Sequence, residues 1–284
     1  MAAPTFDLQS HSTWSDGALR PAEVVRLARE AGVELLALTD HDTVDGVDEA
    51  LAAAAREGLR LVPASELSAL DGDREDLHVL AYGIDHRDPG LCDALHRWRR
   101  DRAARGTRMA AAMGELGWAV EVPDRGDKPL GRPHLAQAIF DHPDNRMRLR
   151  REGLVNFSQL LESYLIPGRP GYLRRTVPDV AEAIEVIHAA GGVAVWAHPF
   201  WDLAADADVL EAIDRFAALG LDGVEAFYPT HGPDQVNAIA DRCAELGLLT
   251  TGSADFHGPA HPMFNRFRAF DLHGRQPNLG PIAA

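Results

Sequence analysis

The sequence predicts an α/β barrel that is interrupted by a basic, mainly helical insert. Short apolar stretches typical of buried strands alternate with amphipathic helical stretches in residues 1–90 and again in residues 176–284. Histidine and carboxylate residues recur directly after these strands. Residues 91–175 break the alternation and carry charge of the opposite sign. A chain of 284 residues is long enough to bury the core of such a barrel.

Residues 1–90 predict four strands and two helices. The first helix begins at Pro21, a favoured first helical residue, and its apolar side chains, such as Val24 and Ala28, share one face. Because strands and helices alternate at short spacing, we expect parallel strands, with Ser65 and Glu66 in a loop after the third strand. The expected strands are 6–8, 35–38, 59–63 and 78–82, and the expected helices are 21–31 and 47–56.

The pattern changes after residue 88, where an arginine-rich helix is expected over 91–113, followed by further helical pieces up to residue 164. Between residues 95 and 175 the chain holds 16 basic and 9 acidic residues, whereas the remainder holds 12 basic and 34 acidic residues. We therefore expect residues 91–175 to form a basic insert or cap on an acidic barrel. The alternation resumes with expected helices 180–190, 207–219 and 234–246 and expected strands 192–196, 223–226 and 249–251.

The composition excludes several classes of protein. A net charge of −15 argues against a stable complex with nucleic acid. No stretch approaches the roughly 20 apolar residues of a membrane helix, and the N-terminus has no signal-peptide pattern, so no membrane partner is expected. The cysteines, Cys92 and Cys243, form neither a metal-binding pair nor a disulfide framework. These observations favour a cytoplasmic protein, either a monomer or a small homo-oligomer.

Clusters of histidine and carboxylate residues follow the predicted strands. One such cluster is typical of a turn or a helix cap, but six at the same end of successive elements indicate a shared site. Imidazole and carboxylate ligands without thiolates suit Zn²⁺, Mn²⁺ or Fe²⁺ in a catalytic centre. The clusters are Gln9/His11/Asp16, Asp40/His41/Asp42, Glu66, His78, His198 and Asp255/His257.

These motifs resemble the PHP (polymerase and histidinol phosphatase) superfamily, and within it the small bacterial phosphoesterases that include nucleoside 3′,5′-bisphosphate phosphatases. The resemblance spans residues 5–258 as an ordered set of motifs, each weak on its own. It implies a distorted seven-stranded β/α barrel, related to the TIM barrel, and two or three divalent ions of manganese, iron or zinc. The motifs are Asp7–Ser12 with Ser15–Gly17, Thr39–Asp42, Glu66, His78, Ala197–Pro199 and Ser253–Gly258.

The resemblance also implies three metal sites. Gln9 stands where most relatives have a histidine, so we expect a weak ligand, or a side chain that holds a bound water, and a metal that is retained less tightly. Asp40 and Asp42 are expected to orient His41 or to cap the next helix. The implied ligand sets are His11/Glu66/Asp255, Glu66/His78/His198 with Glu66 as a bridge, and Asp16/His41/His257.

Such a centre predicts hydrolysis of a phosphomonoester. Divalent ions lower the pKa of bound water towards ~7 and stabilise charge on phosphoryl oxygens, so we expect a metal-bridging hydroxide to attack the phosphorus. Asp255 or His198 is expected to assist proton transfer, and no protein nucleophile is required.

Four residues are candidates for substrate binding: Ser12, Arg132, His134 and His231. The motif from Gly131 to His134 resembles one that grips a phosphate away from the metals in the same branch of the family, and arginine offers bidentate contacts for this. The alternative is a helix entry with Pro133 at its first position and His134 on the surface.

Aromatic residues also lie beside the ligand motifs. Tyr228 follows a predicted strand and resembles a substrate-side position of the family, while Trp14, Phe200 and Trp201 flank the clusters. The sequence leaves two roles open for them, stacking on a nucleobase or closing the rim of the barrel.

We therefore expect a metal-dependent phosphoesterase that acts on a nucleotide, such as a 3′,5′-bisphosphate, or on a short 5′-ended oligonucleotide. One alternative is a histidinol-phosphate-like or other small-metabolite phosphatase. An alternative of another class is a non-catalytic metal-binding or regulatory barrel that lost activity with the histidine at position 9. A polymerase-associated proofreading module is disfavoured because the chain has no polymerase region.

Overall fold

The computed structural model describes residues 4–122, 130–176 and 178–284, apart from the side chain of Asp76. The chain folds as two compact units. One contains residues up to Leu95 and from Pro178 onwards, and the other contains residues 96–177. Within the described residues, no helix has the length and apolar character needed to cross a membrane.

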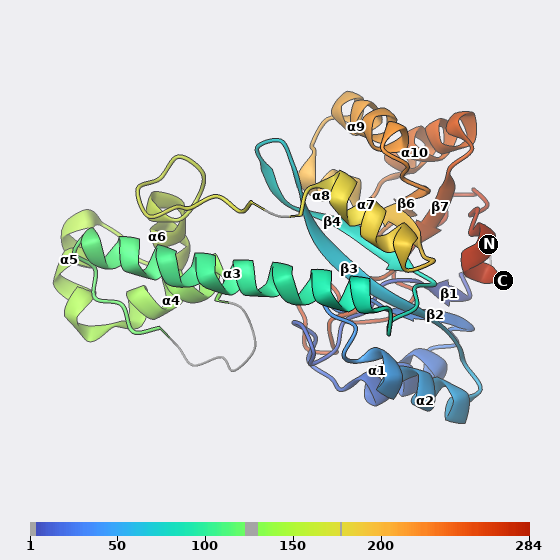
Figure 1. The fold of residues 1–284 in the computed structure, drawn as a ribbon, viewed down its shortest axis with the longest axis horizontal. Helices are drawn as coiled ribbons and strands as arrows, with labels where there is room; N and C mark the ends of the chain where they lie inside the picture. The colour runs from blue at the N-terminus through green and yellow to red at the C-terminus, as the bar shows by residue number, and fades with distance from the viewer. Residues whose placement is uncertain (1–3, 123–129, 177) are drawn as a thin grey trace. The chain divides into compact units, whose positions relative to one another are not determined.

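A seven-stranded sheet forms the centre of the first unit, with the strands in chain order from β1 to β7 (Figure 1). The sheet curls until its two ends meet. The Leu8 N–H donates to the Gly252 carbonyl at 3.2 Å, and the His11 N–H donates to the Phe256 carbonyl at 2.8 Å. This nearly closed barrel confirms the predicted fold class. The strands are β1 (Phe6–Asp7), β2 (Leu35–Leu38), β3 (Arg60–Asp71), β4 (Arg74–Tyr82), β5 (Val193–Trp196), β6 (Gly223–Phe227) and β7 (Leu249–Gly252).

The strand β3 differs from the sequence prediction in length and direction of pairing. It runs from Arg60 through Ser65 and Glu66 to Asp71, so the loop expected after residue 63 is wrong. It then pairs with β4 as an antiparallel hairpin, and β4 is also antiparallel to β5, so the expected all-parallel sheet is wrong there. Only Gly72 and Asp73 separate the two strands, and Gly72 has a φ of 58°. A two-residue connection of this kind joins antiparallel strands only.

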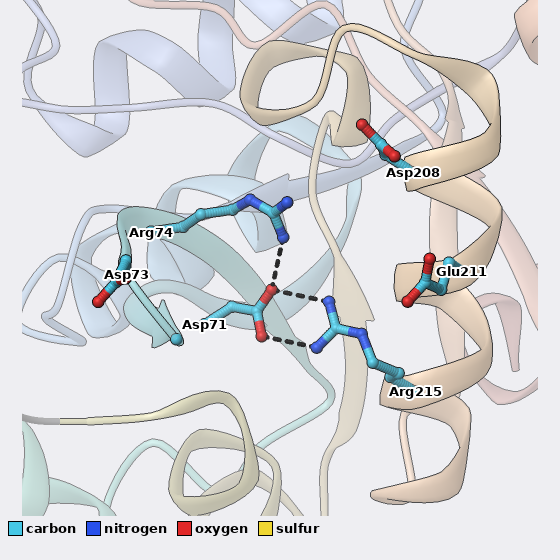
Figure 2. Close-up of a pocket in the computed structure, with 7 residues that line it drawn as sticks. Asp71, Asp73, Arg74, Asp208, Glu211 and Arg215 are labelled. Carbon is cyan, nitrogen blue, oxygen red and sulfur yellow. Dashed lines mark hydrogen bonds and ion pairs between the residues drawn. The ribbon is translucent and has the colours of Figure 1, made fainter.

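The tip of this hairpin is held against a neighbouring helix. Asp71 accepts two hydrogen bonds from Arg215 of α9 (Asp206–Ala218), at 2.8 and 2.9 Å, and a third from Arg74 at 3.0 Å. We call this arrangement the Asp71 clasp (Figure 2). Together with Gly72, Asp73, Asp208 and Glu211 the clasp lines a shallow surface pocket.

Amphipathic helices surround the sheet because each has one apolar face to bury. Val24, Val25 and Ala28 of α1 pack with Leu36 and Leu38 of β2 in one buried cluster. The expected positions of the five long helices of this unit are confirmed to within a few residues. The helices of this unit are α1 (Pro21–Glu30), α2 (Val47–Glu57), α7 (Val180–Ala189), α8 (Pro199–Asp202), α9 (Asp206–Ala218), α10 (Pro233–Leu246) and the 3₁₀ helix η2 (Gly280–Ala283).

The second unit is helical in its described residues and has its own apolar core. Met113, Trp118, Leu135, Ile139 and Leu160 are buried there together. Its helices are α3 (Pro89–Glu115), which begins in the first unit, then α4 (Arg132–Asp141), η1 (Pro143–Asn145), α5 (Arg146–Glu152) and α6 (Phe157–Tyr164).

Candidate metal centre

The barrel brings the eight predicted metal ligands close to one another. His11, His41 and His198 come just after β1, β2 and β5, and Asp255 and His257 follow β7. Glu66 and His78 instead lie inside the β3–β4 hairpin, because this hairpin extends beyond the end of β2. A bridge between His41 and Glu66 places the middle of β3 level with the end of β2. Asp16 is in the loop after β1.

Glu66 is the centre of the cluster. Its Oε2 lies 3.1 Å from His11 Nε2, and its Oε1 lies 2.8 Å from His78 Nδ1 and 3.2 Å from His198 Nε2. Burial by itself raises the pKa of Glu66, but the neighbouring imidazoles of His41 and His78 outweigh it and hold the pKa well below its usual range. The carboxylate is therefore ionised and contacts imidazoles on both oxygens.

Three groups of side chains place ligand atoms close enough to share an ion. They are His11/Asp16/His41/His257, His41/Glu66/His78 and His11/Glu66/Asp255. The group His11/Glu66/Asp255 is one of the ligand sets that the sequence predicts. The four-residue group contains another predicted set, Asp16/His41/His257. His198 Nε2 lies 3.3 Å from His78 Nδ1, so it lies beside the remaining group.

The cluster has the character of a metal centre. It crowds five imidazoles against three carboxylates, and the rings of His11, His41 and His257 stack with centroids 4.3 to 4.6 Å apart. His41 Nδ1 and His198 Nδ1 are buried and have no hydrogen-bond partner in the described parts of the chain. Buried imidazole nitrogens normally have a partner, and a divalent cation would supply one.

Backbone strain accompanies this arrangement. His198 has a φ of 26° and Asp255 a φ of 53°, in the left-handed region that non-glycine residues rarely adopt. Such conformations cost about 1–3 kcal/mol each and persist where surrounding contacts enforce them. Here the contacts come from two buried carboxylates. Glu225 accepts the His198 N–H at 2.9 Å, and Asp7 accepts the Ala254 N–H at 2.8 Å.

Gln9 is oriented by its hydrogen bonds. Its amide nitrogen donates to Glu66 Oε2 at 2.8 Å, and its oxygen lies 3.3 Å from Ser253 Oγ. The nitrogen cannot bind a cation, and the oxygen is turned towards Ser253. In this structure Gln9 therefore positions Glu66.

Asp40 and Asp42 hold backbone segments in place. Asp40 accepts hydrogen bonds from the Ser12 N–H, the Ser12 hydroxyl and the Ser15 hydroxyl, each at 2.7 Å. Asp42 accepts the Ser68 N–H at 2.8 Å. The next helix, α2, has Gly46 at its N-cap and no side-chain cap. The expected capping role is therefore wrong, and Asp40 fixes the loop after β1 while Asp42 fixes β3.

A cavity of about 150 Å³ opens onto the centre. Polar ligands line one part of it, namely His41, Glu66, His78, His198, Asp255 and His257. Trp201, Tyr228 and Phe264 line the rest, and we call these three residues the aromatic wall. The Tyr228 hydroxyl donates to Asp255 Oδ2 at 2.7 Å, which joins the wall to the centre.

The candidate substrate residues belong to different units. Ser12 is fully buried with its hydroxyl on Asp40, and His231 is 5% exposed with Nδ1 bonded to the Ala226 carbonyl, so both have internal partners. Arg132 and His134 belong to the second unit, in the first turn of α4. The Arg132 guanidinium lies 6.0 Å from the ring of Tyr172.

Glu225 is a functional candidate that sequence reasoning missed. It is fully buried in β6, and besides the His198 N–H it accepts the Ser253 hydroxyl at 2.6 Å. Burial raises its pKa to about 8. The available signal was an acidic residue within the otherwise apolar strand Gly223–Phe227, since carboxylates are rarely buried without a specific role.

Comparisons with known proteins agree with this geometry. The PHP domain model matches residues 7–120. A 3′,5′-nucleoside bisphosphate phosphatase of Chromobacterium violaceum is 34% identical over 262 residues, which cover 89% of this chain and 87% of that protein. A 5′-3′ exoribonuclease of Haemophilus influenzae is also 34% identical, over 89% of this chain and 90% of that protein.

Solved structures give the same result for the fold. A structure of an amidohydrolase from Chromobacterium violaceum, with bound sulfate and no metal, superposes with a TM-score of 0.75 at 31% identity and covers 98% of this chain and 93% of that one. A putative metal-dependent phosphoesterase from Bifidobacterium adolescentis has a TM-score of 0.71 at 28% identity, and covers 96% of this chain and all of that one.

Proposed function

This chain belongs to the PHP domain family and is a metal-dependent phosphoesterase, and on that premise we propose that it hydrolyses the phosphomonoester of a nucleotide or of a short 5′-ended oligonucleotide. The observation that carries the proposal is the convergence of five histidines and three carboxylates around Glu66 at the floor of a cavity with an aromatic wall. Two relatives of equal identity act, by their names, on a nucleoside bisphosphate and on RNA ends.

We assign the ligand roles to the side chains in the three groups, with Glu66 shared between two of them. Bound divalent ions would activate water as a nucleophile and neutralise charge on the phosphoryl oxygens. His11 bonds to Asp255 Oδ1 at 3.1 Å while Tyr228 donates to Oδ2, so these two residues hold the carboxylate of Asp255 from both sides.

Proton transfer is assigned to His198 and Asp255. His198 lines the cavity, and Glu225 fixes its backbone, so its ring is directed at Glu66. Asp255 lines the same cavity through the carboxylate that Tyr228 orients. Both groups therefore face the space where a leaving oxygen would need a proton.

Arg132 and His134 remain our candidates for gripping a second phosphate of the substrate. Arginine at the N-terminal turn of a helix combines a bidentate donor with the positive end of the helix dipole. This assignment rests on the motif and on that local position.

The test is phosphate release in the presence of Mn²⁺ from adenosine 3′,5′-bisphosphate, short 5′-phosphorylated RNA, histidinol phosphate and p-nitrophenyl phosphate. We expect turnover of one of the first two substrates to exceed that of histidinol phosphate by at least about tenfold, which is 1.4 kcal/mol in transition-state binding. Preference for histidinol phosphate would contradict the nucleotide proposal.

Matched variants test whether turnover depends on the candidate metal centre rather than on other parts of the chain. Glu66→Gln and His41→Ala should reduce turnover of every substrate by at least about 100-fold, because each removes a ligand atom. His188→Ala is the control, since His188 is paired with Asp222 on the surface of the same unit. Arg132→Ala should reduce turnover of the bisphosphate and spare p-nitrophenyl phosphate. Undiminished turnover in Glu66→Gln would overturn the ligand assignment.

A further inference from the structure

We propose that Trp201 is the specificity-determining residue of this site and stacks on the nucleobase of the substrate. This inference rests on the proposed function and extends it to recognition of the base, the part of the substrate that lies away from the phosphate. The observation that carries it is the large exposed ring of Trp201 beside the ligands of the metal centre.

Trp201 is 57% exposed although it lines the cavity. The other two residues of the aromatic wall, Tyr228 and Phe264, are buried and make internal contacts. Tyr228 is buried and its hydroxyl is bonded to Asp255, and Phe264 is 8% exposed and stacks on His261 with an interplanar angle of 14°. Trp201 therefore offers the largest solvent-accessible aromatic surface of this wall.

Trp201 is held close to the candidate metal centre by its place in the chain, just after His198. It lies in α8, which starts directly after His198, and its backbone N–H donates to the His198 carbonyl at 2.8 Å. The ring centroids of Trp201 and His198 are 6.5 Å apart. In a nucleotide, one pentose separates the phosphate from the base. A phosphate held at the centre therefore directs its base towards the side chains that border the cavity.

Phe264 supports the indole of Trp201 from one side. The two rings have centroids 5.9 Å apart and an interplanar angle of 53°, a tilted contact of the kind that aromatic pairs favour. This contact restrains the indole on one side, and more than half of the Trp201 surface remains exposed to a ligand.

Stacking predicts which substrates are accepted. Every nucleobase has a π face, so recognition by stacking tolerates all bases and discriminates against phosphate esters without a planar ring. We therefore expect purine and pyrimidine nucleotides to bind more tightly than a sugar phosphate of the same charge.

The experiment measures binding of AMP, CMP and ribose 5-phosphate to the Mn²⁺-loaded protein by titration calorimetry. In the wild type, both nucleotides should bind more tightly than ribose 5-phosphate. Trp201→Ala should weaken the binding of AMP and CMP by about tenfold or more, within the range measured for base–aromatic stacking, and change ribose 5-phosphate binding by less than about twofold. Trp201→Phe should recover most of the nucleotide affinity.

Trp14→Ala is the matched control, because Trp14 is 47% exposed and is not among the residues that line the cavity. It should leave the ratio of the AMP and ribose 5-phosphate dissociation constants at the wild-type value. Equal weakening of all three ligands in Trp201→Ala, or no weakening, would overturn the proposal. Failure of the proposed function is a separate result, namely no phosphate release from nucleotides while Trp201-dependent binding of AMP persists.

Discussion

Gln9 changes the chemistry of the centre at the scale of one residue. An imidazole at this position would offer a nitrogen lone pair to a cation, whereas the amide nitrogen of Gln9 donates to Glu66 and its oxygen faces Ser253. Compared with a histidine at this position, Gln9 gives the carboxylate of Glu66 a neutral hydrogen-bond donor. It does not give the adjacent His11/Glu66/Asp255 group a fourth ligand. We therefore expect a lower affinity for one ion than a histidine at position 9 would give, while the hydrogen bond from Gln9 holds Glu66 in place.

The first prediction concerns retention of this ion. After mild dialysis, the wild type should retain fewer equivalents of Mn²⁺ than Gln9→His, because the new imidazole adds a ligand and should tighten the site by about tenfold or more, as supporting groups around metal ligands do. Metal content by mass spectrometry measures the difference. Gln137→His, on the surface of α4 in the second unit, is the control. Three equally retained ions in the wild type would refute the idea.

At the scale of elements, the β3–β4 hairpin is the feature that sequence reasoning described least well. The sequence predicts a loop at Ser65 and Glu66, but both are fully buried within β3. Glu66 is tolerated there because imidazoles surround it. Sequence alone does not reveal such partners, since they come from four other strands or strand ends.

The other strands and helices were predictable because their patterns are local. Strands such as Leu35–Leu38 are short apolar runs, and helices such as Pro21–Glu30 have a clear apolar face. The grouping of the eight candidate ligands could be predicted because their motifs occur in a fixed order. Glu225 and the orientation of Gln9 could not, because both depend on contacts between distant parts of the chain.

The second prediction concerns the Asp71 clasp, which restrains the hairpin that carries Glu66 and His78. Arg215→Ala should raise hydrogen exchange at the hairpin tip and lower the free energy of unfolding by about 1 kcal/mol or less, since the pair is partly exposed and screened. Arg242→Ala, which removes another arginine–carboxylate pair of the same unit, should leave exchange at the tip unchanged. Unchanged exchange in Arg215→Ala would contradict a restraining role.

The contribution of the clasp depends on pH. Hydrogen bonds from Arg215 lower the pKa of Asp71 below its ordinary value of 3.8. A carboxyl with a depressed pKa in the folded state contributes stability above its unfolded pKa and loses it as the pH falls through the folded value. The difference in the free energy of unfolding between wild type and Arg215→Ala should therefore be constant from pH 7 to about 5 and should decrease below about pH 4. Thermal unfolding at several pH values measures it.

At the scale of the whole molecule, the ligand cluster links the strands of the barrel. The members of the three groups, from His11 to His257, come from positions that span most of the first unit. An ion that binds them binds only the folded chain, so it stabilises the fold by mass action.

The third prediction follows from this linkage. Removal of metal by EDTA should lower the melting temperature by roughly 5–10 °C, which corresponds to an ion present at about 100 times its dissociation constant, and Mn²⁺ should restore it. Differential scanning calorimetry measures both steps. Glu66→Gln should show little dependence on EDTA. A wild-type melting temperature that is insensitive to EDTA and Mn²⁺ would argue against ligation across the strands.

The meeting of β1 with β7 has a consequence for synthesis of the protein. His11 emerges from the ribosome early, yet its partner Asp255, 3.1 Å away in the folded barrel, is 244 positions later in the chain. Contacts so distant in sequence form slowly because a long loop must close first. Nascent chains that end before β7 therefore display histidines without the carboxylate that completes their site. An ion that needs both His11 and Asp255 as ligands could therefore bind only after the last strand has been made.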